Sequence, residues 1–252
     1  MVRITINTMK KLIIIIFLLL LTGCSQQVDS SKSVYSENID IIFGSTTFSD
    51  DFNDNILDTE KWTESTNAGS LVVEQNNQLE VISSASVSGF VKSVSSSSPQ
   101  NTQLIVKVTQ TSTDAGFKLC PTDPAGHQWD VYSETNWYNF QLISGGVLSP
   151  NVKDAGTTTQ VGGDSPSLTA PYWMRIRIDA TTIYFDYAEQ STKPIESEWT
   201  NISSEVWDMG TGITQEQYVY LTGYNTPTTG EPNYDDFSWT TYTSRRIINL
   251  SN

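Results

Sequence analysis

Apolar and polar side chains alternate in short runs from residue 48 onward, and turn residues separate the runs. Residues 103–109, QLIVKVT, place Leu104, Val106 and Val108 on one side, and residues 172–179, YWMRIRID, repeat the pattern. A period of two residues is typical of a β-strand with one buried face. The chain holds roughly twelve to fourteen such runs, more than one open sheet usually accommodates. The pattern therefore predicts an all-β fold in which antiparallel strands form a two-sheet sandwich.

Two stretches fit this alternation less well. Residues 144–169 contain five glycines and two prolines, and we predict that they are mostly loop. Loops of that length in a compact domain are usually functional lids or disordered segments. Residues 39–43, IDIIF, are predicted either as an additional edge strand or as part of a linker.

The first 24 residues combine basic side chains, an apolar run over 12–21 and the tetrapeptide LTGC at 21–24. This pattern resembles the lipobox of bacterial lipoproteins, which implies a signal peptide at 1–23, cleavage before Cys24 and diacylglycerol on the Cys24 sulfur. The alternative, a buried N-terminal helix, fits poorly with so uniformly apolar a run beside a cysteine. The run is also too short to span a bilayer as a mature helix. We therefore predict a lipid-anchored protein of the cell envelope, at the outer membrane or the cell surface.

The residues after Cys24 indicate a tether followed by one domain. Residues 24–38 are rich in Ser, Gln and Asp, a composition typical of a flexible linker. Residues 39–252 are predicted to form one β domain, without an internal repeat. Ser25 stands where an Asp would resemble an inner-membrane retention signal, which favours the outer membrane in a Gram-negative host.

Charge and composition exclude one class of partner. The chain has 28 Asp and Glu against 14 Lys and Arg, and its formal net charge of −14 becomes −17 when the three basic residues of the leader are removed. Such a surface repels nucleic-acid phosphates, so we exclude nucleic-acid binding. Only 17% of the residues are charged and 11% are aromatic, which is typical of extracellular β proteins. We expect a monomer.

Cysteine usage gives no sign of a disulfide or a thiol nucleophile. If Cys24 is lipidated, Cys120 has no partner left in the chain. A nucleophilic cysteine needs a nearby base, and the single histidine, His127, lies in the loop-like segment PTDPAGH. We therefore interpret Cys120 as a small packing residue.

Two motifs at opposite ends of the domain carry a family resemblance. FSDDFNDNILDTEKW at 48–62 resembles the opening of concanavalin A-like lectin and glucanase domains, and NYDDFSW at 233–239 resembles their closing strand. The resemblance implies an antiparallel jelly-roll sandwich with the first and last strands side by side. We assign four tryptophans to its core, because large aromatic side chains are more often found there than at sites: Trp62, Trp129, Trp199 and Trp239.

The enzymatic branches of that superfamily match the chain only in part. The opening is similar to glycoside hydrolase family 16, whose catalytic motif Glu-x-Asp-x-x-Glu is absent from the sequence. Retaining hydrolysis needs two carboxyl groups about 5 Å apart. The nearest remnant, QWDVYS at 128–133, places Gln128 and Ser133 at the two catalytic positions, where neither can act. We therefore expect no catalysis by this motif. A glycoside hydrolase or lyase with another site, and a structural or adhesive lipoprotein without a small ligand, remain as alternatives.

A glycan-binding face is the main functional hypothesis. Sugars stack their C–H faces on aromatic rings and form hydrogen bonds with amides and charged groups. The residues on the polar side of the middle strands combine these types: Lys107, Lys118, Asp130, Tyr132, Trp137, Asn139, Gln141, Arg175, Arg177, Tyr218 and Tyr220. If these strands share the concave sheet, the residues line a groove that binds a glycan or polysaccharide. The alternative is that such cross-strand pairs only stabilise an exposed sheet face.

The acidic pairs in the two terminal motifs suggest a cation. Asp50, Asp51, Asp235 and Asp236 come close together if the first and last strands pair, and like charges repel unless a cation joins them. Related jelly rolls often hold a structural Ca²⁺ near this seam, so the resemblance implies one here. Further oxygen donors are available at Asn53, Asp54 and Asp58. The alternative is that these carboxylates face solvent and accept backbone hydrogen bonds.

Overall fold

The structure is a computed structural model, and one compact unit covers Glu37–Leu250. The residues that it describes are 37–43, 46–66, 70–83, 88–98, 100–110, 115–120, 137–143, 146–154, 156–179, 182–206, 216–224 and 233–250. Cys24, the predicted tether up to residue 36 and the segment with Trp129, Asp130 and Tyr132 lie outside these ranges, whereas Glu37 and Asn38, predicted as the end of the tether, belong to the first strand. Within them, no helix is long and apolar enough to cross a membrane.

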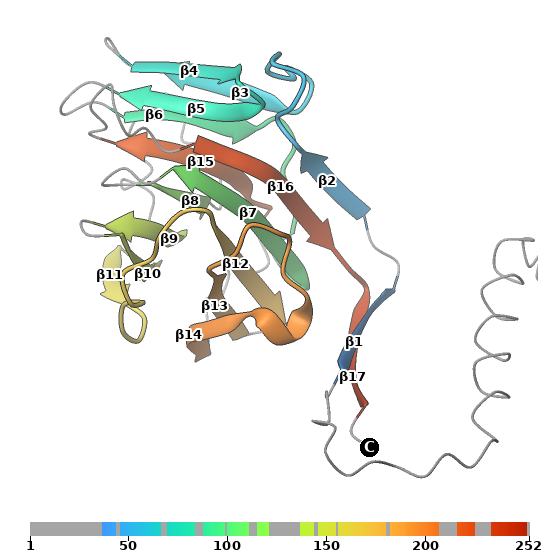
Figure 1. Ribbon diagram of the computed structural model, residues 1–252. Coiled ribbons are helices and arrows are strands. Elements are labelled where there is room, and N and C mark those ends of the chain that lie inside the picture. The colour runs from blue at the N-terminus through green and yellow to red at the C-terminus, as the bar shows by residue number, and fades with distance from the viewer. Residues whose placement is uncertain are drawn as a thin grey trace, which may run out of the picture. The chain divides into compact units, whose positions relative to one another are not determined.

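The described chain is almost entirely β-strand, and every strand pairing is antiparallel (Figure 1). A seven-stranded sheet has the order β11-β10-β9-β8-β15-β6-β3, and an eight-stranded sheet has the order β14-β13-β12-β7-β16-β5-β4 with β2 paired to β16. The bounds in the seven-stranded sheet are β3 Trp62–Thr66, β6 Ser88–Ser93, β8 Ala115–Cys120, β9 Trp137–Ile143, β10 Val147–Asp154, β11 Thr157–Gln160 and β15 Tyr218–Tyr224. Those in the eight-stranded sheet are β2 Thr46–Asp50, β4 Ser70–Gln75, β5 Gln78–Ser83, β7 Thr102–Gln110, β12 Tyr172–Asp179, β13 Thr182–Ala188, β14 Thr200–Val206 and β16 Asn233–Thr241. The predicted all-β sandwich is confirmed.

The two terminal motifs meet as the resemblance implies. Phe48 of β2 lies opposite Trp239 of β16, and Asp50 lies opposite Phe237. Beyond this seam, β1 (Glu37–Phe43) pairs with β17 (Ser244–Leu250) in a separate two-stranded ribbon. Residues 39–43 are thus a strand, but their partner is the end of the chain rather than the edge of a sheet.

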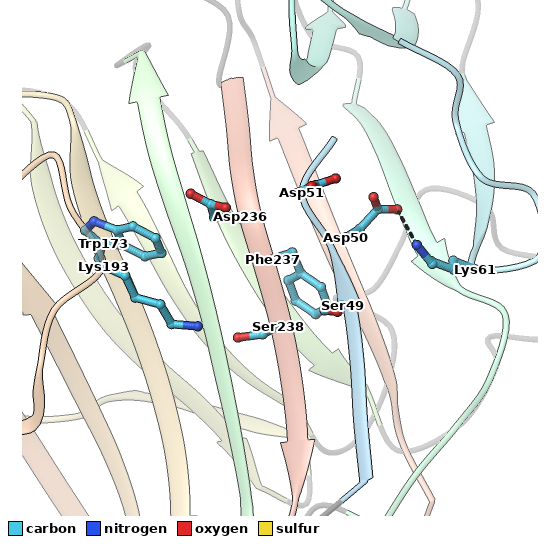
Figure 2. A pocket seen from close by; sticks show the side chains of 9 residues that line it. All are labelled: Ser49, Asp50, Asp51, Lys61, Trp173, Lys193, Asp236, Phe237 and Ser238. Atoms are coloured by element: carbon cyan, nitrogen blue, oxygen red, sulfur yellow. Dashed lines mark ion pairs between the residues drawn. The ribbon is translucent and has the colours of Figure 1, made fainter. Parts of the chain in front are cut away.

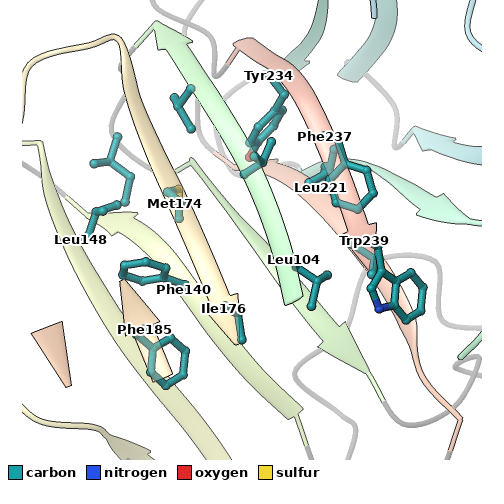
Figure 3. Close-up of a cluster of buried hydrophobic side chains, with 14 of the residues drawn as sticks. Leu104, Phe140, Leu148, Met174, Ile176, Phe185, Leu221, Tyr234, Phe237 and Trp239 are labelled. Atoms are coloured by element: carbon teal, nitrogen blue, oxygen red, sulfur yellow. The ribbon is translucent and has the colours of Figure 1, made fainter. Parts of the chain in front are cut away.

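The core lies between the two sheets and follows the alternation of the sequence (Figure 3). Leu104 and Val106 of β7 and Met174 and Ile176 of β12 face Phe140 and other apolar side chains from the seven-stranded sheet. Burial of each such side chain stabilises the fold by about 1.5–3 kcal/mol. Among the tryptophans assigned to the core, Trp62 and Trp239 are buried there, whereas Trp199 is only half-buried and stacks on Arg175.

The prediction that residues 144–169 are mostly loop missed two strands, β10 with 8 residues and β11 with 4 residues, although these cover less than half of the segment. Leu148 and Val152 of β10 are buried in the core. The glycines lie at the turns: Gly146 precedes β10 and Gly156 lies between β10 and β11, both with positive φ. Such angles suit glycine because it lacks a Cβ. The glycine content thus marks tight turns between short strands.

Candidate functional site

The residues predicted to share one ligand-binding face belong to two different sheets. Those on the outer face of the seven-stranded sheet are Trp137, Asn139, Gln141, Tyr218 and Tyr220, and Lys118 belongs to β8 of the same sheet. Those on the outer face of the eight-stranded sheet are Lys107, Arg175 and Arg177. The expectation of a single face is therefore wrong, because alternation tells which side of a strand a residue occupies but not which sheet the strand joins.

An aromatic cluster occupies part of the outer face of the seven-stranded sheet. It consists of Phe90 from β6, Trp137 from β9 and Tyr220 from β15, with Tyr218 packed against it. The rings of Phe90 and Tyr220 lie 5.3 Å apart at 61°, an edge-to-face arrangement that favours association of aromatic rings. Trp137 is only 2% exposed and Tyr220 is fully buried, so neither is the open groove residue that the sequence predicts. Tyr218 is half-buried, with Lys92 Nζ 4.6 Å from its ring centre.

A row of amides and a hydroxyl crosses the same face beside the aromatic cluster. It consists of Asn139 and Gln141 on β9, Ser149 and Asn151 on β10 and Gln160 on β11, which lie opposite one another in register. The Asn139 amide donates to Gln141 Oε1 at 2.5 Å, and the Gln160 amide donates to Ser149 Oγ at 3.3 Å. Asn139 Oδ1 is buried and has no hydrogen-bond partner among the described residues. We call these five residues the polar row.

Arg175 takes part in a charge network on the outer face of the other sheet. Its Nε donates to Asp186 Oδ2 at 2.8 Å and its Nη1 to Glu196 Oε2 at 2.7 Å. Glu196 lies in the short 3₁₀ helix η2 (Glu196–Glu198) and also pairs with Arg245 of β17 at 2.8 Å. The guanidinium stacks 4.4 Å from the Trp199 ring centre. Because Arg175 is buried and fully engaged, its position is that of a structural residue rather than a ligand contact.

The other two cations predicted for the ligand face also have partners within the fold. Arg177 pairs with Asp179 and stacks 3.9 Å from the Tyr184 ring centre. Lys107 Nζ lies 2.9 Å from Asp235 Oδ2 and 5.8 Å from the Trp173 ring centre. The Arg177–Asp179 pair lies within β12, whereas the contacts with Tyr184, Asp235 and Trp173 join neighbouring strands of the eight-stranded sheet.

The predicted acidic seam carries its own counter-charges. Asp50 accepts a hydrogen bond from Trp62 Nε1 at 2.8 Å and lies 3.8 Å from Lys61 Nζ, while Asp235 and Asp236 both pair with Lys107. Between Asp235 and Ser238 the register of β16 shifts, and Asp236 has a φ of 48°, which identifies a β-bulge.

Three of the four acidic side chains line one hollow of about 390 Å³ (Figure 2). Asp50, Asp51 and Asp236 surround it together with Lys61, Lys193 and Trp173. Burial, and then the neighbouring Asp235, raise the pKa of Asp236. In the described part of the chain no group of three or more Asp, Glu, His or Cys is placed to hold a metal ion. The described side chains thus fit Ca²⁺ poorly, and calcium at this seam stays a prediction.

Glu74 is a residue with unusual chemistry that the sequence reasoning missed. It is 3% exposed, its Oε1 accepts the Asn55 N–H at 3.0 Å, and its Oε2 has no partner among the described residues. Burial and the facing Asp54 carboxyl raise its pKa to about 7. The signal was present in the run LVVEQ at 71–75, where Glu74 shares the inward side with Val72.

Comparison with known proteins gives matches only at the level of structure. No family model matches the sequence, and no curated protein does. A Bacillus subtilis protein of unknown function with a galectin-like fold is similar over 81% of this chain and 100% of its own, with 10% identity and a TM-score of 0.58. β-Agarase A, solved in complex with oligoagarose, covers 81% and 94% at 13% identity and a TM-score of 0.56. Winged bean acidic lectin, solved with methyl-α-D-galactose, covers 81% and 99% at 11% identity and a TM-score of 0.51. Together with the strand order, these likenesses show that the domain has the concanavalin A-like, galectin-like jelly-roll sandwich fold.

Proposed function

We propose that this protein is a lipid-anchored protein of the cell envelope whose jelly-roll domain binds a glycan without cleaving it. The ligand site is the outer face of the seven-stranded sheet. Of the residues predicted from the sequence, Asn139, Gln141 and Tyr218 belong to this proposed site, and Lys118 lies in β8 of the same sheet.

The observation that carries this proposal is the pairing of the polar row with the aromatic cluster on one sheet face. Amide groups can donate and accept hydrogen bonds at the same time, which matches the hydroxyl groups of a sugar. The half-buried Tyr218 and Gln141 lie on strands of the same sheet. Trp137 and Tyr220 are buried within the aromatic cluster of this face, a role suited to rings that position ligand contacts.

The non-catalytic part of the proposal rests on the missing acid–base pair. Gln128 and Ser133 stand where the resemblance to family 16 enzymes requires two Glu, and no Glu-x-Asp-x-x-Glu motif occurs elsewhere. The structural neighbours support a glycan ligand more broadly, because their descriptions include a lectin with bound galactoside and an agarase with bound oligosaccharide. The agarase also favours the second candidate function, a glycoside hydrolase with a different catalytic constellation.

The test is a panel of oligosaccharides and polysaccharides, including agarose oligomers, laminarin and galactosides, applied to the full chain in mild detergent. Binding and release of reducing ends are scored together, with and without calcium. We expect binding without release. Release of reducing ends would establish the hydrolase instead, and failure of every glycan to bind would favour a structural or adhesive lipoprotein.

Matched variants locate the site. Gln141→Ala and Asn151→Ala remove half-buried amides from the polar row, and each should weaken binding about tenfold, as loss of one good hydrogen bond does. Gln103→Ala removes a half-buried amide from the outer face of the eight-stranded sheet and should leave binding unchanged. If Gln103→Ala weakened binding and the other two variants left it unchanged, the site would instead lie on the eight-stranded sheet. The measurements with and without calcium also include Asp236→Asn, and they test whether this variant alters binding or stability only when calcium is present.

A further inference from the structure

A small hollow lies at the margin between the two sheets and shares no lining residue with the polar row or the aromatic cluster. Phe48 and Trp239, on the paired strands β2 and β16, form one side of it. The remaining described lining residues all carry hydroxyl groups: Ser93, Ser95, Ser96, Ser97 and Thr241. Its volume is about 220 Å³, below the roughly 300–1,000 Å³ of pockets for drug-sized ligands. The hollow therefore suits a single small ring.

Trp239 lines this hollow and carries a buried donor that is not used within the described residues. The side chain is 4% exposed, and its indole N–H has no acceptor among the described residues. A buried donor without a partner is unfavourable, so a ligand oxygen that accepted this hydrogen bond would remove the penalty. Phe48 lies 6.5 Å from Trp239 in an edge-to-face arrangement and is only half-buried. Figure 3 shows Trp239 at one margin of the core cluster, beyond Leu104.

The hydroxyl groups complete a neutral, polar rim. Ser97 Oγ lies 3.2 Å from Thr241 Oγ1, and Ser96 Oγ donates to Glu216 Oε2 at 2.7 Å. Each serine or threonine hydroxyl can both donate and accept a hydrogen bond, so it can bind either the oxygen or the hydrogen of a ligand hydroxyl. None of the described lining residues is ionisable. An anionic ligand would lose hydration there without gaining a counter-charge, whereas a cation could pair with the Glu216 carboxylate beside Ser96.

We propose that this hollow is a second binding site, which accepts one ring of a neutral sugar or a comparable neutral polyol. The ring face packs against Phe48 and Trp239, one ligand oxygen accepts the Trp239 indole N–H, and the serine rim binds the remaining hydroxyls. The site is separate from the sheet face of the proposed function and does not depend on that function.

The test follows the Trp239 indole N–H by NMR in the full chain labelled with ¹⁵N-tryptophan. Methyl β-D-glucopyranoside, methyl β-D-galactopyranoside and myo-inositol serve as neutral probes, and the anions glucuronate and galacturonate serve as charged probes of similar ring size. Trp239→Phe identifies the Trp239 signal by its disappearance. We expect at least one neutral probe to shift this signal in a saturable way, whereas the charged probes leave it in place.

A pair of serine variants tests the rim while Trp239 remains as the reporter. Ser97→Val replaces a lining hydroxyl by two methyl groups and should weaken binding of the neutral probe about three- to tenfold. Ser98→Val is the matched control, because its side chain does not line the hollow. If Trp239→Phe does not fold, the Trp239 signal is assigned from its contacts with the Phe48 ring instead.

Three results would overturn the proposal: no shift of the Trp239 signal with any neutral probe, an equal response to charged probes, or equal effects of Ser97→Val and Ser98→Val. The two proposed sites fail separately. Glycan binding that depends on Gln141 while the Trp239 signal stays fixed would reject only the second site. A Trp239 response without any glycan binding at the polar row would reject only the first.

Discussion

Arg175 and Asp186 lie directly opposite each other on β12 and β13 and form a buried ion pair with an N–O distance of 2.8 Å. Glu196 and Arg245 extend the pair, so two positive and two negative side chains come together from β12, β13, η2 and β17. A balanced set of this kind has little net charge to desolvate, but removal of one member leaves a buried charge without a partner.

Arg175→Met should therefore destabilise the protein by about 3–5 kcal/mol, the usual cost of breaking a buried ion pair. Urea unfolding followed by tryptophan fluorescence measures the change. Lys193→Met is the control, since Lys193 belongs to the same region but is exposed, and it should change stability by less than about 0.5 kcal/mol. Equal effects of the two variants would contradict a structural role for the network.

The buried carboxyl of Glu74 should make stability depend on pH. Its folded-state pKa of about 7 lies above the ordinary value of 4.5, so the folded protein holds a proton that the unfolded chain has lost. This contribution to stability is fully present below about pH 4.5 and is lost as the pH rises through about 7. We expect the urea midpoint to fall over this range, and Glu74→Gln should remove that part of the fall.

Two further variants identify the cause of the Glu74 effect. Asp54→Asn removes the facing carboxylate, so the fall in stability should move to lower pH. Glu80→Gln is the control, because the Glu80 carboxylate already accepts hydrogen bonds from Gln75 and Asn76. A pH profile that is the same in Glu74→Gln and in the unaltered protein would refute the assignment.

Gly162 marks a close approach between the ends of the two sheets. A Cβ at this position would lie 2.5 Å from Ser203 Cβ on β14, and φ is +69°. Gly162→Ala should lower stability by more than the roughly 1–2 kcal/mol expected for a left-handed residue alone. Gly156→Ala is a matched control, with a φ of +86° but no atom within 4 Å of the added Cβ. Thermal unfolding of the two variants separates steric contact from backbone strain, and identical midpoints would contradict the close approach.

Lipid anchoring through Cys24 predicts that a variant without this cysteine moves from a detergent phase to the aqueous phase. The unaltered full-length precursor, expressed in a bacterium, should partition into the detergent phase of Triton X-114 and take up labelled fatty acid. Cys24→Ala should lose the label and move to the aqueous phase, because one sulfur carries the diacylglycerol. Cys120→Ala should behave like the unaltered protein. Label that persists in Cys24→Ala would show that the LTGC tetrapeptide is not the site of modification.

Local pattern predicted the strands well because period-two alternation directly reflects burial on one side. The inward positions Leu104, Val106, Met174 and Ile176 are core residues, and β2 pairs with β16 as the terminal motifs indicate. The glycines of residues 144–169 misled the prediction, since glycine is equally compatible with a long loop and with tight turns between short strands.

The candidate site was less predictable because it depends on which strands become neighbours. Arg175 and Gln141 both lie on outward positions, yet they belong to opposite sheets. Outward position also does not imply exposure: Trp137 faces away from the main core and is buried in a second cluster. The unused N–H of Trp239 and the orphan oxygen of Glu74 arise from contacts between distant segments, which no local window of sequence contains.

The seam between β2 and β16 also bears on mechanical strength. Five residue pairs join the strands, from Thr46 opposite Thr241 to Asp50 opposite Phe237, and β1, which precedes β2 in the chain, pairs with β17 over seven further residue pairs (Figure 1). A pull applied through β1 along the strand axis would load both pairings in shear, so the residue pairs of each would be strained together instead of opening one after another. A domain held by its N-terminal side would thus resist flow or traction at the strand pairing that closes its fold.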